Sequence, residues 1–143
     1  KQDKSNQLYP SDPFICCKVD SMLDQEADIF TGISVARYKE RFGFDFLNTN
    51  EELVKEVYES IVDNVLPKHL HNLDRILADS STGWFADTPE PTICDFNLAP
   101  RLKWLTEGIE GIPSTILNNY SNIINFMKKF YEELPSVVSY YNK

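Results

Sequence analysis

Apolar residues recur at intervals of three and four along most of this chain, the spacing of an amphipathic α-helix. The clearest series predicts a long helix after Thr49 and consists of Leu53, Val54, Val57, Tyr58, Ile61, Val62, Val65, Leu66, His69, Leu70, Leu73, Ile76 and Leu77. A second long helix is expected from Pro13 to about Glu40, and shorter ones after Ser121 and from Pro135. We find no stretch with the alternation of a strand, so the pattern predicts an all-α fold.

One segment is apolar on nearly every side and predicts a buried central helix. It runs from Ile93 to Leu105 and follows Thr92. Thr92 and Asp95 have the spacing of a capping box, in which each side chain bonds the backbone N–H of the other. We therefore expect about five helices packed around this central helix, with Trp84-Phe85 folded back onto the core.

Local signals predict where the other helices begin and bend. Ser11-Asp12-Pro13 combines capping side chains with a proline at the first helical position. Thr49 and Glu52 form a second candidate capping box, and Ser121 is a candidate cap for a later helix. Pro67 interrupts the longest apolar series and predicts a kink there.

Composition restricts the classes of function. The 143 residues suit one domain, which we place at residues 11–143 after a linker remnant at 1–10. The formal net charge of −8, with no cluster of Lys and Arg, argues against nucleic acid and anionic membranes as partners. Cys16, Cys17 and Cys94 form no Cys-x-x-Cys pair, which favours reduced thiols and a cytoplasmic location.

Few residues suggest chemistry. Asp20, Asp24 and Asp28 are spaced four apart, so they form one stripe along the first helix, either a solvated face or a site for a cation or ligand amine. His69 and His71 diverge on a helix and are expected to be structural. Cys94 lies in a first helical turn, which lowers thiol pKa, but its expected burial favours a structural role. We expect no catalytic residue and no metal in the chain.

Taken together, these segments resemble the C-terminal helical domain of cytosolic glutathione S-transferases. Its signature capping segment is matched by Pro91-Thr92-Ile93-Cys94-Asp95-Phe96, with Cys94 in place of the usual Ala. Other matches in the same order are Leu8-Tyr9-Pro10, Lys18-Val19-Asp20 with Asp24 and Ala27-Asp28-Ile29, Leu66-Pro67-Lys68-His69-Leu70 with Leu73-Asp74, and Leu134-Pro135-Ser136-Val137.

The resemblance implies different roles for two domains of the intact protein. In that family an N-terminal thioredoxin-like domain, absent here, holds most of the glutathione site and the catalytic residue, and the subunits pair as dimers. It implies that Asp28, with Asp24 one turn earlier, reaches the glutathione amine across the dimer. Further along the same face, Tyr38 and Arg37 match positions that line the site for hydrophobic electrophiles. Thr92 and Asp95 remain structural.

Two questions stay open at this point. The acidic stripe favours sigma- or pi-like members, which use Tyr, whereas Leu98-Ala99-Pro100-Arg101-Leu102 resembles Cys-type relatives such as dehydroascorbate reductases. The same helical domain also serves without catalysis in translation factors and synthetase complexes, so an interaction or scaffold module is the alternative to a transferase. On either interpretation, the isolated chain is expected to be inactive.

Overall fold

The computed structural model describes residues 8–141 and contains only helices and turns within that range. The helices are α1 (Pro13–Arg37), α2 (Glu51–Ser60), α3 (Leu66–Asp79), α4 (Ile93–Leu105), α5 (Ser121–Glu133) and α6 (Pro135–Tyr141). A π-helical turn at Ile61–Val65 joins α2 to α3, and two 3₁₀ turns (Lys39–Phe42 and Asp45–Thr49) lie between α1 and α2. The all-α prediction is confirmed, and the joined α2 and α3 leave five helical rods.

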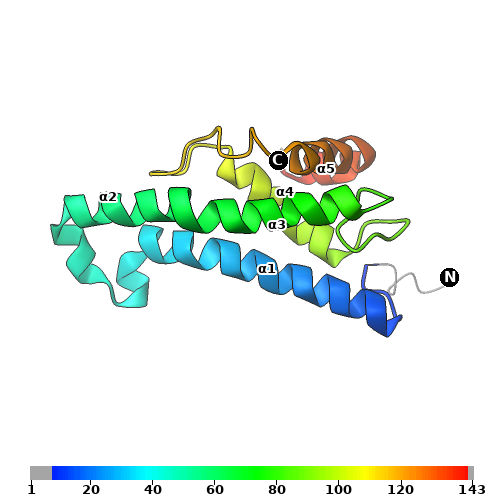
Figure 1. The fold of residues 1–143 in the computed structure, drawn as a ribbon, viewed down its shortest axis with the longest axis horizontal. Helices are drawn as coiled ribbons and strands as arrows, with labels where there is room; N and C mark the ends of the chain where they lie inside the picture. Colours follow the sequence, from blue (N-terminus) through cyan, green and yellow to red (C-terminus); the bar gives the residue numbers. More distant parts are fainter. Residues whose placement is uncertain (1–7, 142–143) are drawn as a thin grey trace.

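The rod formed by α2 and α3 passes through Pro67 without the kink that the sequence predicts. Proline has no N–H to donate to the preceding turn, so a regular helix would be interrupted here. The π turn before it widens the helix, and the N–H of Leu66 bonds the carbonyl of Ile61 instead. Figure 1 shows the rod continuing in the same direction and returning alongside α1.

Side chains cap the starts of α1 and α2, the first as predicted and the second at the residue next to the predicted one. Asp12 caps α1 as expected, accepting the N–H groups of Phe14 and Ile15 at 2.9 and 3.0 Å. The helix ends at Arg37 rather than near Glu40. Asn50, not Thr49, caps α2, because the Asn50 amide oxygen accepts the N–H of Leu53 at 3.0 Å.

The buried central helix is α4, as predicted, and it packs against α1 and α5. The side chains of Leu98, Ala99, Leu102 and Leu105 are fully buried, whereas Ile93 at its start is 42% exposed and departs from the prediction. Trp84 and Phe85 fold back onto the core as expected, and the ring centroid of Phe85 lies 4.7 Å from that of Phe126 on α5.

Helix α5 is capped from another helix rather than by Ser121. The carboxylate of Asp74, on α3, accepts the N–H groups of Asn122 and Ile123 at 2.9 and 3.1 Å. The same carboxylate accepts the side-chain amide of Asn122 at 2.8 Å. Since the positive end of a helix dipole favours an anion, this contact fixes the N-terminus of α5 against α3.

The segment Leu8-Tyr9-Pro10 lies against the start of α1 and α4. The carbonyl of Leu8 accepts the N–H of Ile93 at 2.8 Å, and the Tyr9 hydroxyl donates to the carboxylate of Asp20 at 2.8 and 2.9 Å. The rest of the predicted linker (residues 1–7) and the last two residues of the predicted domain lie outside the described range. Across residues 8–141, we find no helix with the length and apolarity needed to cross a membrane.

Candidate functional site

The acidic stripe on α1 divides into one structural residue and two free ones. Asp20 binds the hydroxyl of Tyr9, and this hydrogen bond raises the pKa of Tyr9 to about 12. Asp24 and Asp28 are exposed and make no hydrogen bond or ion pair with any residue from 8 to 141. The stripe is therefore an unpaired carboxylate surface only at Asp24 and Asp28.

The residues between these two acids show which way the stripe faces. Gln25 contacts α3. Its amide nitrogen lies 2.6 Å from Nδ1 of His69, and its amide oxygen accepts a hydrogen bond from the side-chain amide of Asn72 at 2.9 Å. Glu26 is buried against α4 and pairs with Arg101 at 2.9 Å. Because neighbouring positions of α1 already cover α3 and α4, Asp24 and Asp28 lie on the side of α1 that no described helix covers. His69 has the structural role expected of it.

Arg37 and Tyr38 lie at the C-terminal end of α1, and Arg37 does not share a face with Asp28. Arg37 is nine residues beyond Asp28, which is half a revolution at about 100° per residue. Its guanidinium lies 5.5 Å from the ring centroid of Trp104 on α4 and 5.6 Å from that of Tyr38. Tyr38 is the C-cap of α1 and is 49% exposed. The structure therefore brings Arg37 and Tyr38 together at the end of α1, more than two helical turns beyond Asp24 and Asp28.

A cavity of about 320 Å³ lies where α1 ends. It is lined by Arg37, Tyr38, Lys39, Glu40, Arg41 and Asn48. Arg37 and Tyr38 were predicted as site residues from the sequence. The other four lining residues belong to the 3₁₀ turns and were not predicted. Their signal, a run of charged residues after the last apolar position of α1, is common on solvated loops and would not have singled them out.

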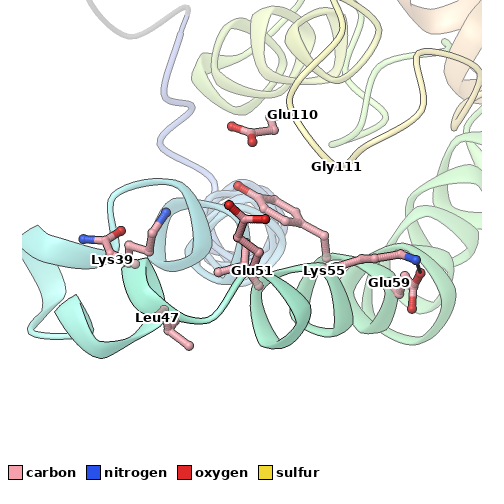
Figure 2. A pocket seen from close by; sticks show the side chains of 10 residues that line it. Lys39, Leu47, Glu51, Lys55, Glu59, Glu110 and Gly111 are labelled. Carbon is pink, nitrogen blue, oxygen red and sulfur yellow. Dashed lines mark ion pairs between the residues drawn. The ribbon is translucent and has the colours of Figure 1, made fainter.

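A larger cavity of about 600 Å³ adjoins it and shares Lys39 and Asn48. Figure 2 shows its walls, formed by the 3₁₀ turns, by Glu51 and Lys55 of α2, and by the loop after α4 at Glu110 and Gly111. Lys55 is paired with Glu59 at 3.6 Å. Sequence reasoning missed this cavity because it depends on a loop meeting a helix that lies about fifty residues earlier.

A contact between Tyr58 of α2 and Gly111 holds the loop after α4 against α2. Gly111 has a φ of 77°, and a Cβ built there would lie only 2.6 Å from Cδ1 of Tyr58, so the aromatic ring packs directly on the backbone. Tyr58 is 7% exposed. Burial raises the pKa of Tyr58, the nearby Glu110 carboxylate adds to the rise, and the Arg37 guanidinium opposes it. The charges of Glu110 and Arg37 thus act in opposite directions on the pKa of Tyr58, which lines the larger cavity.

The capping residues of α4 form a closed polar cluster. Asp95 is fully buried, and its carboxylate accepts the N–H of Phe85 at 3.0 Å and, at 2.7 and 3.0 Å, the N–H and hydroxyl of Thr92. The predicted capping box is present. Burial raises the pKa of Asp95, and the donors from Phe85 and Thr92 offset part of that rise. Because the donors to the Asp95 carboxylate all come from residues of this chain, the cluster has a structural role.

Cys94 next to this cluster is not an activated thiol. Burial raises its pKa to about 12, with the Asp95 carboxylate adding to the effect. The first-turn position was expected to lower the thiol pKa, but desolvation outweighs the helix dipole here. Among residues 8–141, no group of three His, Cys, Asp or Glu side chains is arranged to hold a metal ion.

Comparison with known proteins identifies one family. A model described as "Glutathione S-transferase, C-terminal domain" matches residues 39–143. No curated protein and no solved structure gives a significant match. The matched range contains Thr92 and Asp95, and it begins just after the α1 residues Asp24, Asp28, Arg37 and Tyr38.

Proposed function

This chain belongs to the glutathione S-transferase C-terminal domain family, and from that premise we propose that it is the helical half of an enzyme that adds the thiolate of glutathione to hydrophobic electrophiles. The observation that supports this proposal is the family match over residues 39–143. Glutathione is the general substrate of this family, whose members generally carry an N-terminal domain and form dimers.

In the proposed enzyme, the thioredoxin-like domain binds glutathione and stabilises its thiolate. The helical domain contributes contacts to the second subunit of a homodimer and one wall of the electrophile site. We place the enzyme in the cytoplasm, in keeping with three cysteines that form no disulfide in the structure.

Asp28 is the proposed contact to glutathione. The ligand carries an ammonium group on its γ-glutamyl residue, and an exposed carboxylate can accept a charge-assisted hydrogen bond from it. The geometry of α1 supports this role because Asp28 has no partner among residues 8–141 and its face of α1 is not covered by a described helix. Asp24, one turn earlier, adds a second negative charge to the same surface.

Tyr38 and Arg37 are proposed to contact the electrophile. Both line the cavity at the end of α1, and the phenol of Tyr38 is accessible from solvent. A phenol can donate a proton or hydrogen bond to a leaving group or a developing oxyanion as the thiolate adds. The Arg37 guanidinium, stacked on Trp104, holds the tyrosine ring beside the cavity.

A conjugation assay tests the proposed activity. The complete protein, including its thioredoxin-like domain, should accelerate the reaction of glutathione with a hydrophobic aryl halide above the spontaneous rate. The 143-residue chain alone should show no acceleration, because the group that activates the thiol lies in the other domain.

Two results would contradict this proposal. Turnover by the 143-residue chain alone would place a catalytic group within it. Failure of the complete, correctly folded and glutathione-binding protein to turn over a panel of electrophiles would favour the non-catalytic interaction module instead.

A further inference from the structure

Positive charge is concentrated at the cavity where α1 ends, in a chain whose net charge is −8. Three of its lining residues are cations, Arg37, Lys39 and Arg41, and one is an acid, Glu40. None of the three cations forms an ion pair within residues 8–141. The cavity therefore has an unbalanced positive charge.

Nearby negative groups do not cancel this charge. Glu40 accepts a hydrogen bond from the side-chain amide of Asn48 at 2.8 Å, which occupies one carboxylate oxygen. The C-terminal end of α1 contributes about half a negative charge. Glu51 and Glu110 line the adjoining larger cavity, on the other side of the shared Lys39. Arg41 lines only the smaller cavity, so an anion there would meet Arg37 and Arg41 before these acids.

Exposed aromatic residues are frequent in the segment that contributes most of the cavity lining, residues 38–48. Tyr38, Phe42, Phe44 and Phe46 are 49%, 47%, 37% and 60% exposed, although they lie within nine residues of one another. The rings of Phe44 and Phe46 meet edge to face with centroids 6.0 Å apart. Clustered exposed apolar groups mark binding surfaces more often than scattered ones do, and Phe44 and Phe46 form such a cluster.

From this combination we propose that the cavity selects electrophiles with a negatively charged group, a carboxylate above all, attached to an aromatic or other apolar body. This inference depends on the proposed function, since it names the class of electrophile for the same site. Arg37 and Arg41 would bind the carboxylate, with Lys39 adding long-range attraction. The apolar body would lie against the ring of Tyr38, the aromatic residue in the cavity lining.

A matched pair of probes tests this selectivity without relying on catalysis. Cinnamate and cinnamamide share the ring and the unsaturated chain and differ in charge. Calorimetric titration of the complete protein without glutathione should give a dissociation constant about tenfold lower for cinnamate. Arg41→Glu should abolish this preference. Lys128→Glu makes the same charge change at an exposed position of α5, where Lys128 pairs with Glu132, and should preserve it. Raising the ionic strength should reduce the preference, because exposed charges are screened.

The other outcomes separate the two proposals. Equal binding of cinnamate and cinnamamide would overturn charge selection and leave a general electrophile site in place. A preference that survives in Arg41→Glu would overturn the assignment to this cavity. No binding of either probe would overturn the selectivity proposed here, while glutathione turnover in the conjugation assay would show that the proposed activity stands.

Discussion

Asp95 and Asp28 are both helical carboxylates, yet their surroundings differ in every respect that matters for function. Asp95 is fully buried at the start of α4 and accepts hydrogen bonds from Phe85 and from both donors of Thr92. Asp28 lies on an open face of α1, with no partner from residue 8 to 141. The two residues have the same side chain, but one accepts hydrogen bonds from three buried donors and the other accepts none within the described residues.

The comparison separates residues that identify the fold from residues that can act on a ligand. Removing Asp95 would strand buried donors, so its replacement affects folding first. Removing Asp28 strands no buried group within the described chain, so its replacement should leave the free energy of unfolding nearly unchanged. The family match covers Asp95 and begins after Asp28.

The largest change in the free energy of unfolding is expected for replacement of Asp95. Asp12 is the matched control, because it also accepts two backbone N–H groups at the start of a helix but is exposed to solvent. Asp95→Ala leaves the buried N–H groups of Phe85 and Thr92 without acceptors and should lower the free energy of unfolding by about 3–5 kcal/mol. Asp12→Ala should cost about 1 kcal/mol, because water replaces the cap. Urea titration at neutral pH measures both. Equal losses would mean that burial does not distinguish the two caps.

A smaller effect tests the contact that shapes the larger cavity. Gly111 and Gly43 both have positive φ, at 77° and 78°, but only a Cβ on Gly111 would overlap the ring of Tyr58. Both alanine substitutions incur the cost of left-handed backbone. Gly111→Ala should lower the free energy of unfolding by about 1–3 kcal/mol more than Gly43→Ala, because the packed ring must move.

Thermal or urea unfolding of these two variants is the measurement. If the losses are the same, the ring of Tyr58 is free to move aside, and the loop after α4 is not held against α2 as the structure shows.

Local sequence patterns predicted those features of the fold that depend on the residues of a single helix. The spacing of apolar residues identified α1, the α2–α3 rod and α4, and Thr92 with Asp95 marked a real capping box. Predictions of helix caps failed where a residue other than the predicted one accepts the first backbone N–H groups of the helix. Asn50 replaces Thr49 as a cap, and Asp74 on α3 supplies the cap of α5, a tertiary contact that no local pattern contains.

The candidate site was less accessible from sequence for the same reason. The resemblance drew attention to Arg37 and Tyr38, which do line a cavity, but Arg41 and Asn48 complete it through the 3₁₀ turns. Asp20 belongs to the predicted acidic stripe, but its carboxylate accepts a hydrogen bond from the Tyr9 hydroxyl. Spacing shows which residues share a face of a helix, but not which of them will find partners when the chain folds.

The most direct test of the central claim is the affinity of the complete protein for glutathione when Asp28 is replaced by Asn, which removes the charge and keeps the size. The dissociation constant should rise about tenfold, as expected for loss of a charge-assisted hydrogen bond, while the free energy of unfolding stays within about 0.5 kcal/mol. Asp63→Asn, at another exposed carboxylate, should change neither quantity. An unchanged glutathione affinity in Asp28→Asn would contradict the account.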